Sequence, residues 1–169
     1  MAEGHRDEEA RRWFVQAHYD LRAATWSLEG GFHDTACFLA QQAAEKALTS
    51  AHYHLGSSRR VLLTHSVVVL LRKAIPAAPG FSECLEAARE LDLHYVPSRY
   101  PNGLPSGYPH QFYGKETAEK AIAASRKIME RIEEVYRIRG VTWLQDEEAL
   151  EPPPSAPKRE NPEGSDNKV

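Results

Sequence analysis

Hydrophobic residues recur at intervals of three and four along most of the chain. The first series lies between residues 7 and 28 and comprises Ala10, Trp13, Phe14, Ala17, Leu21, Ala24 and Leu28. This spacing places its members on one face of an α-helix. A second series extends from Phe32 to Leu55, and Gly30-Gly31 between them favours the left-handed conformation that ends helices. The two segments predict an antiparallel helical hairpin.

A short apolar segment from Val67 to Ile75 follows and stops before Pro76. Thr64 or Ser66 can accept the hydrogen bonds of a helix N-terminus there. The β-branched run at residues 67–69 also fits a strand. No other segment offers a partner strand, so we interpret residues 67–75 as a third helix.

Two more helices are predicted after Pro76. One extends from Ser82 to about Leu93 and opens with cap-type and acidic residues. The last series is the longest, and Gly140 follows it; its members are Ala118, Ala121, Ile122, Ser125, Ile128, Met129, Ile132, Val135 and Tyr136. No segment shows the sustained alternation typical of strands. The pattern therefore predicts an all-α, up-and-down bundle of four or five helices.

Two stretches are expected to be non-helical. Residues 96–114 contain four prolines and three glycines, which predicts a long loop before the last helix. The other stretch, residues 141–169, is acidic, rich in proline and poor in apolar residues. Such a segment cannot bury a core, so we expect a disordered tail after one helical domain at residues 1–140.

Composition and charge exclude several classes of protein. The chain of 169 residues is long enough for one domain with a core. Its net charge is −3, and residues 141–169 hold seven acids and three bases, so residues 1–140 carry +1. No apolar run approaches the roughly 20 residues that span a bilayer, and charged residues occupy the N-terminus where a secretory signal would be apolar. We expect a cytoplasmic protein. The total charge does not support an extended basic surface, and a local basic patch stays open as an alternative.

Cysteine and histidine give no sign of a disulfide, metal or cofactor. Cys37 and Cys84 lie in helical patterns, so we expect free, buried thiols. His52 and His54 are two residues apart, whereas helical metal pairs are three or four apart. Glu45 and Lys46 are charged neighbours in the second helix and belong either to salt bridges or to the wall of a ligand groove.

The loop before the last helix is the best candidate site. Between Leu93 and Lys115 there is no acidic residue, and the segment is rich in basic and aromatic side chains, namely His94, Tyr95, Arg99, Tyr100, Tyr108, His110, Phe112, Tyr113 and Lys115. Arginine and lysine pair with phosphate and tyrosine rings stack on bases, so this mixture suits a nucleotide. The alternative is structural: the aromatic rings fix the loop to the helices, and Arg99 caps a helix C-terminus.

Four pieces of residues 8–139 together resemble HEPN domains (higher eukaryotes and prokaryotes nucleotide-binding). These pieces are the apolar face of the first helix, FLAQQAAEKAL at residues 38–48, THS at residues 64–66 and YVPSRYPN at residues 95–102. The arginine-tyrosine-proline loop is most similar to the branch that includes the C-terminal domain of sacsin. The resemblance implies a helical bundle, a homodimer and a nucleotide or RNA ligand. We assign nucleotide binding to Tyr95, Arg99, Tyr100, Asn102 and Lys115; many relatives carry an acid in place of Asn102.

The resemblance also implies two alternative functions. Many HEPN proteins are metal-independent ribonucleases that use an arginine followed a few residues later by a histidine. Arg89 and His94 lie closest to the expected place, although Glu90 follows Arg89 where the motif prefers Asn, Asp or His. Histidine would act as general acid or base and arginine would stabilise the phosphorane. The second alternative is an interaction module that partners a separate nucleotidyltransferase.

Overall fold

The structure is a computed structural model that describes residues 3–145, and every regular element in this range is helical. The helices of eight or more residues are α1 (Glu3–Glu29), α2 (His33–His54), α3 (Val67–Ala74), α4 (Leu85–Asp92) and α6 (Lys115–Ile138). The shorter ones are α5 (Pro109–Phe112) and the 3-10 helices η1 (Arg59–Leu62), η2 (Pro79–Cys84), η3 (Pro101–Gly103) and η4 (Trp143–Gln145). The predicted all-α bundle is confirmed.

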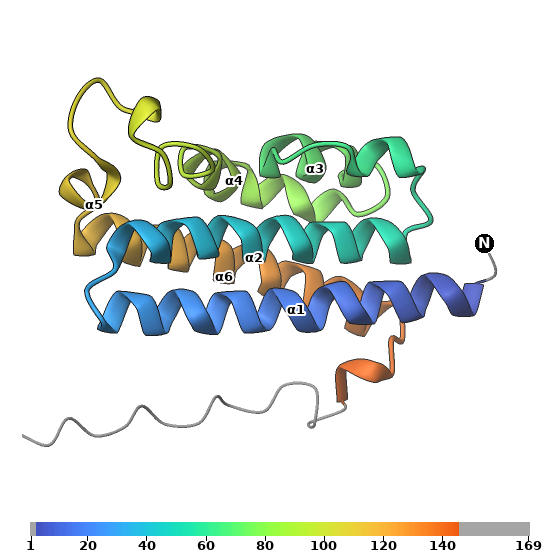
Figure 1. Cartoon of the computed structure of the whole chain (residues 1–169). Coiled ribbons are helices and arrows are strands. Elements are labelled where there is room, and N and C mark those ends of the chain that lie inside the picture. Colours follow the sequence, from blue (N-terminus) through green and yellow to red (C-terminus); the bar gives the residue numbers. More distant parts are fainter. Residues whose placement is uncertain (1–2, 146–169) are drawn as a thin grey trace, which may run out of the picture.

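Helices α1 and α2 form the predicted hairpin and lie side by side along their length, with α6 packed against α2 (Figure 1). Gly31 in the turn between them has a φ of +82°. This backbone conformation is unfavourable for residues with a side chain. The short helices α3 and α4 pack against each other and against α2 on the opposite side from α1 (Figure 1). The loop that follows α4 leads to one end of the bundle, where α6 begins.

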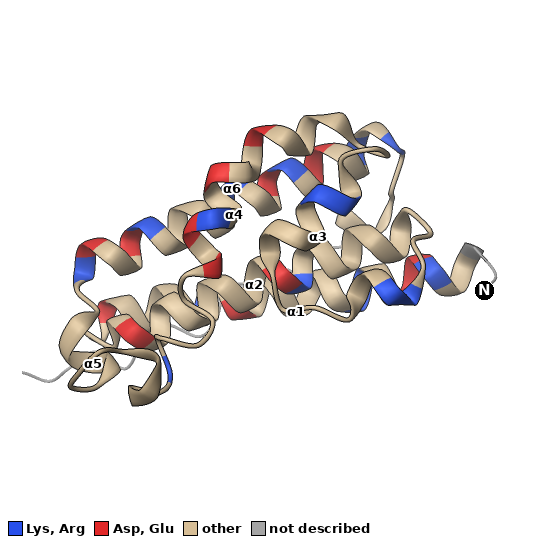
Figure 2. Cartoon of the chain, turned by 90° about the horizontal axis from the view of Figure 1, so that it is seen from above, with Lys and Arg blue, Asp and Glu red and all other residues tan. Residues whose placement is uncertain are grey.

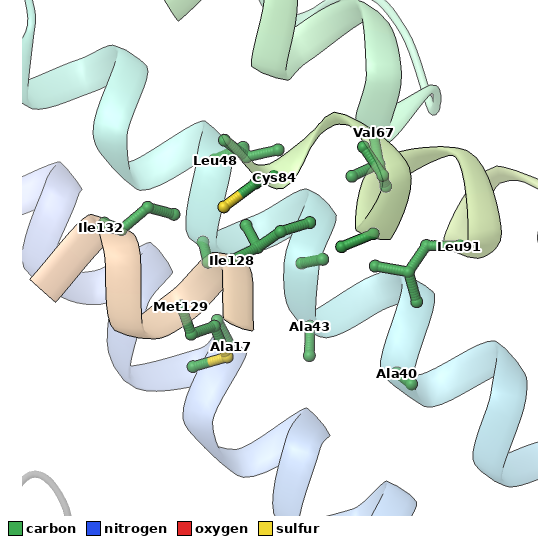
Figure 3. Packing of buried hydrophobic residues seen from close by; sticks show 14 of the residues in the cluster. Ala17, Ala40, Ala43, Leu48, Val67, Cys84, Leu91, Ile128, Met129 and Ile132 are labelled. Atoms are coloured by element: carbon green, nitrogen blue, oxygen red, sulfur yellow. The ribbon is translucent and has the colours of Figure 1, made fainter. Parts of the chain in front are cut away.

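The core lies where α2 meets α1, α4 and α6 (Figure 3). The face of α2 that enters it consists mainly of small side chains, and Ala40, Ala43 and Ala47 are fully buried. Small residues let neighbouring helices approach closely, and the larger Leu91 and Ile128 of those helices fill the space. Cys37 and Cys84 are free and buried, as predicted.

One position on the apolar face of α1 differs from the expectation. Phe14 is fully buried and contacts Tyr136 edge-on, with ring centroids 5.4 Å apart. Trp13 is only half-buried and stacks on Tyr53 of α2, with ring centroids 6.5 Å apart. The core of the hairpin is therefore centred on Phe14, and Trp13 covers its edge.

Helix α3 is held by a carboxylate distant in sequence. Ser66 caps it, since its Oγ accepts a hydrogen bond from the Val69 amide over 3.1 Å. The Asp92 carboxylate accepts hydrogen bonds from Ser66 Oγ (2.6 Å) and from the amide nitrogens of Val67 (2.6 Å) and Val68 (3.3 Å). These bonds satisfy the free donors of the first turn, which explains a helix where β-branched residues also fit a strand.

Two predicted boundaries are corrected. The predicted fourth helix starts at Ser82, but residues 79–84 form η2 and the α-helix begins at Leu85. The loop at residues 96–114 is not free of helix, because it contains η3 and the single turn α5. Pro109 is the first residue of α5. At this position the fixed φ of proline fits the helix, and the missing N–H would have no partner within the helix.

Residues just beyond position 140 pack against the bundle. Trp143 is half-buried and lies edge-on to Tyr136 and Phe14, with ring centroids 5.2 and 6.0 Å apart. Val141 and Leu144 also contact the core. The packed part of the chain thus extends at least to residue 144, past the expected boundary. The rest of the expected tail, residues 146–169, lies outside the described residues.

Candidate functional site

Arg99 is surrounded by aromatic rings at the start of the long loop. Its guanidinium carbon lies 4.4 Å from the ring centroid of Phe38, 4.6 Å from that of Tyr95 and 4.8 Å from that of Tyr100. Its Nε donates a hydrogen bond to the Tyr95 carbonyl over 2.8 Å. These contacts fix a half-buried cation in one orientation.

The two terminal nitrogens of Arg99 make no hydrogen bond or ion pair with another described residue. Neither terminal nitrogen is a buried polar atom that lacks a partner, so both are accessible to solvent. A guanidinium fork that is fixed by its stem and open at its tip is ready to bind a carboxylate or phosphate in two-point fashion.

His65 is linked to Arg99 by Tyr95, which contacts both side chains. The two rings stack with centroids 4.6 Å apart and an interplanar angle of 17°. The Arg99 guanidinium carbon also lies 4.6 Å from the Tyr95 centroid, so the imidazole and the guanidinium both contact the same tyrosine ring. We call Phe38, His65, Tyr95, Arg99 and Tyr100 the aromatic cluster.

A partly buried carboxylate orients the exposed imidazole. His65 Nδ1 lies 3.1 Å from Glu45 Oε1, and the side chains are 63% and 15% exposed, respectively. Gln41 donates from its Nε2 to Glu45 Oε2 (3.1 Å) and to the His65 carbonyl (2.9 Å). Gln42 donates to the same Glu45 oxygen over 3.2 Å. The network fixes which nitrogen of His65 faces the protein, and it leaves the other for a ligand.

The sequence did not assign Phe38, Glu45 and His65 to one site, although two signals were present. Phe38 and Glu45 are seven residues apart on α2, two helical turns, so they share a face of the helix. His65 belongs to the predicted start of the third helix. Which of these side chains meet the loop depends on how α4 packs on α2, and no local pattern specifies that.

The five residues assigned to nucleotide binding separate into two groups. Tyr95, Arg99 and Tyr100 come together in the aromatic cluster. Asn102 is exposed on η3, and Lys115 is the first residue of α6, 3.6 Å from Glu119. Within the described residues, neither Asn102 nor Lys115 makes a hydrogen bond or ion pair with the cluster.

The structural explanation of the loop aromatics has support in two parts of the loop: Arg99 contacts Phe38 of α2 and donates to the Tyr95 carbonyl, and the end of the loop is also fixed to the bundle. Tyr113 is half-buried against the core and lies edge-on to His94, with ring centroids 5.6 Å apart. His110 Nδ1 lies 3.2 Å from Asp34 Oδ1, which ties α5 to the start of α2. Tyr108 and Phe112 are exposed by more than half. The end of the loop is thus fixed to the bundle, while Tyr100 at its beginning is 50% exposed.

Arg89 and His94, the candidate ribonuclease pair, have separate partners. Arg89 is exposed and bonds to the Glu86 carboxylate one turn earlier. His94 is 4% exposed, and its Nε2 lies 3.3 Å from Glu90 Oε1. Burial lowers the pKa of His94, and the hydrogen bond to Glu90 opposes that change. A buried, neutral imidazole of this kind is poorly placed to meet an RNA backbone.

The other charged and metal-type residues have structural roles. Lys46 bonds to Asp20 of α1 over 2.5 Å, whereas Glu45 bonds to His65, so the charged neighbours in α2 serve different contacts. His52 is buried, with its Nε2 2.9 Å from the Leu70 carbonyl. Among the described residues there is no group of three or more His, Cys, Asp and Glu side chains that could hold a metal ion. No described helix is long and apolar enough to cross a membrane.

The fold and the cluster define a helical-bundle protein with an arginine-centred aromatic surface on its α2–α4 side. The model of the HEPN domain family matches residues 10–135, so the chain belongs to the HEPN family. The comparison with curated proteins gave no match.

Solved structures agree with this assignment. The chain is similar to TT1696 from Thermus thermophilus, with 38% identity and a TM-score of 0.70 over 75% of this chain and 97% of that one. It is similar to ST0689, an archaeal HEPN homologue, with 33% identity and a TM-score of 0.62 over 74% and 95%. It is also similar to the HEPN domain protein TM0613 from Thermotoga maritima, with 30% identity and a TM-score of 0.60 over 75% and 98%.

Proposed function

We propose that this HEPN domain protein binds a nucleotide at the aromatic cluster. The observation that carries the proposal is the Arg99 guanidinium, fixed among three rings with its terminal nitrogens open to solvent. A phosphate group accepts two hydrogen bonds from such a fork. The exposed ring of Tyr100 offers a surface on which a base stacks.

The electrostatic surroundings favour an anion. Residues 93–115 contain no acid, and the nearby Glu45 carboxylate is largely buried and already bonded to His65, Gln41 and Gln42. His65 presents its second ring nitrogen at the edge of the cluster and adds a hydrogen-bond partner for phosphate or sugar. Asn102 and Lys115 are proposed as outer contacts, which the ligand reaches only after it binds Arg99.

Calorimetric titration with ATP tests the proposal. Arg99→Ala is expected to weaken binding about tenfold or more, because it removes a charge-assisted, two-point contact. Arg99→Lys keeps the charge but loses the planar fork, so it should recover only part of the affinity. Arg126→Ala removes an exposed cation of α6 and serves as the matched control. Equal affinity of the wild type and a folded Arg99→Ala variant would refute the site.

A homodimer is part of the proposal, and the outer face of α1 supports it. Tyr19 and Trp26 are 45% and 41% exposed on that face, and the Arg22 guanidinium carbon lies 5.0 Å from the Tyr19 ring centroid. Tyrosine, tryptophan and arginine are the residues that dominate interface energies. Light scattering should show a dimer that Trp26→Ala weakens.

The alternatives rest on the family resemblance more than on geometry. Ribonuclease activity through Arg89 and His94 requires His94 to become accessible, and the test is RNA cleavage in chelator by the wild type and by His94→Ala. Partnership with a nucleotidyltransferase remains a proposal from the family resemblance, and membership of the sacsin-like branch remains a proposal from the loop sequence at residues 95–102.

A further inference from the structure

Glu45 has partners that differ from those of the carboxylates on α6. Basic and acidic positions mix along α6 (Figure 2), where Lys120 lies 2.9 Å from Glu116. A lysine can only donate, so such a pair has one possible arrangement of protons. Glu45 instead faces one imidazole and two carboxamides, and each of these groups has both donor and acceptor atoms. The direction of the hydrogen bonds around Glu45 therefore follows from groups further along the network.

A backbone carbonyl fixes one end of this network. The Gln41 amide lies 2.9 Å from the His65 carbonyl oxygen, which can only accept a hydrogen bond. The Gln41 group at this position is therefore the NH₂ group, and it also donates to Glu45 Oε2 over 3.1 Å. The Gln41 oxygen then faces the Gln42 amide at 2.7 Å, so Gln42 must present its own NH₂ group there.

An ammonium group fixes the other end of the network. Lys46 Nζ can only donate, and it lies 3.4 Å from Gln42 Oε1. The Gln42 NH₂ group reaches Glu45 Oε2 over 3.2 Å. Both ends thus assign the same orientation to the Gln42 amide, and Glu45 Oε2 accepts hydrogen bonds from two amide groups.

The proton between Glu45 and His65 belongs to the imidazole. Glu45 Oε1 lies 3.1 Å from His65 Nδ1. A carboxylate is a weaker base than an imidazole, so the proton of this hydrogen bond stays on Nδ1. In the neutral ring the other nitrogen, Nε2, then has no proton and is an acceptor. It has no hydrogen-bond partner among the described residues, and the side chain is 63% exposed.

This acceptor and the Arg99 cation adjoin the same aromatic ring. The His65 ring centroid and the Arg99 guanidinium carbon each lie 4.6 Å from the Tyr95 centroid. The ring centroid of Tyr100 lies 4.8 Å from the same guanidinium carbon, and Tyr100 is 50% exposed. The aromatic cluster thus offers a cation for a phosphate, a ring for a base and an acceptor for a third group.

We infer that His65 Nε2 is a fixed acceptor that selects a sugar hydroxyl, so that the site prefers ribonucleotides to deoxyribonucleotides. The inference rests on the proposed nucleotide site and specifies its ligand class. A phosphate dianion has only acceptor atoms, so it is repelled by this nitrogen and binds the Arg99 fork instead. The 2′- and 3′-hydroxyls of ribose can each donate the hydrogen bond that Nε2 requires.

Calorimetric titrations with ATP, 2′-deoxy-ATP and 3′-deoxy-ATP test the inference at pH 8.5, where the neutral ring is favoured. ATP should bind about three- to tenfold more tightly than at least one analogue, which is the range for one neutral hydrogen bond. The weaker analogue identifies the hydroxyl. His65→Ala should abolish the preference. His110→Ala is the matched control and should keep it, because His110 forms the same kind of contact with Asp34.

Glu45→Gln is the sharper variant, because it should reverse the tautomer of His65. The amide oxygen at position 45 would accept from Gln41 and Gln42, and its NH₂ group would donate to His65 Nδ1. Nε2 would then carry the proton, and the variant should bind all three nucleotides with similar affinity. Two-dimensional ¹H–¹⁵N NMR without nucleotide should show the Nδ1–H tautomer in the wild type and the Nε2–H tautomer in Glu45→Gln.

Three outcomes would overturn the inference while the nucleotide site stands. The first is equal affinity of the wild type for all three nucleotides, and the second is an Nε2–H tautomer of His65 in the wild type. The third is a preference for ATP that survives in a folded Glu45→Gln variant. If the wild type does not bind ATP, the proposed nucleotide site fails and the inference fails with it.

Discussion

The hydroxyl oxygens of Ser50 and Tyr136 lie 2.5 Å apart in the core, where they join α2 to α6. Ser50 Oγ also donates to the Ala10 carbonyl of α1 over 2.5 Å. A serine hydroxyl has one proton, so Tyr136 must be the donor toward Ser50. The chain of two hydrogen bonds therefore crosses all three long helices at a point where water is excluded.

Removal of the Ser50 hydroxyl and removal of the Tyr136 hydroxyl are expected to reduce the free energy of unfolding by different amounts. Tyr136→Phe removes the first donor and leaves Ser50 bonded to Ala10, so it should reduce the free energy of unfolding by about 0.5–1.5 kcal/mol. Ser50→Ala leaves the buried Tyr136 hydroxyl without an acceptor, which should cost about 1–3 kcal/mol. Urea denaturation followed by circular dichroism measures both, and Ser50→Ala/Tyr136→Phe should cost less than the sum. Additive losses would show that the two hydroxyls do not interact.

The buried apolar faces of α1 and α6 lead to a second prediction. Ile132 is fully buried on α6 and Phe14 on α1, so alanine should cost about 2–5 and 3–5 kcal/mol, respectively. Trp13→Ala should cost less than Phe14→Ala, because Trp13 is half-buried and leaves no closed cavity. Leu63→Ala, at a side chain 84% exposed, is the control that should leave the urea midpoint in place. A larger loss at Trp13 than at Phe14 would reverse this ranking.

The three long helices α1, α2 and α6 were predictable because each carries its own three-and-four periodicity. The strand alternative at residues 67–69 fails because Asp92, distant in sequence, binds the first amides of α3. Trp13 and Phe14 are adjacent apolar residues, and which one points to the core depends on the position of α6. Arg99, Tyr95 and Tyr100 were identified locally, whereas Phe38 and His65 reach them only through the packing of α2 and α4.

Two buried histidines predict a loss of stability in mild acid. Burial lowers the pKa of His52 and of His94, while hydrogen bonds to the Leu70 carbonyl and to Glu90 partly oppose it. In the unfolded chain both titrate near 6.5. The unfolded state thus binds more protons below that pH, and stability, complete above about pH 6.5, is lost as pH falls toward the folded-state values. The urea midpoint should drop between pH 7.5 and 5.5.

Replacement of each histidine by glutamine assigns this pH dependence. His52→Gln and His94→Gln should each reduce the fall in midpoint between pH 7.5 and 5.5, even if the variants are less stable throughout. His5→Gln changes an exposed histidine and should keep the wild-type fall. A midpoint that rises in acid would mean that the buried rings are protonated in the folded protein.

The cysteines should resist thiol reagents. Burial is the main cause of a raised pKa at both cysteines. It raises the pKa of Cys37 to about 12, and it also raises the pKa of Cys84. The thiolate is the reactive form, so both should react slowly with Ellman's reagent at pH 8 in native protein. Both should react at once in guanidinium chloride. Rapid reaction of either thiol in the native state would show that α2 or η2 opens readily.

Truncation at two points locates the end of the folded domain. Residues 146–169 have few apolar groups, so a chain that ends at Gln145 should keep the wild-type melting temperature. A chain that ends at Gly140 also loses Trp143 and its contacts with Phe14 and Tyr136. Each aromatic contact of this kind is worth about 0.5–1.5 kcal/mol beyond the area it buries. The shorter chain should therefore melt roughly 5 °C lower, since about 1 kcal/mol shifts a domain of this size by 2–4 °C.

Trp143→Ala in the full chain separates the effect of this one ring from that of chain length. If the ring contacts are responsible, Trp143→Ala should lower the melting temperature nearly as much as truncation at Gly140 does, because Phe14 and Tyr136 then lose the same covering ring. Thr142→Ala, at an exposed neighbour, should have little effect. If the chains ending at Gly140 and Gln145 melt together at the wild-type temperature, the domain ends at residue 140, and the packing of Trp143 contributes nothing to stability.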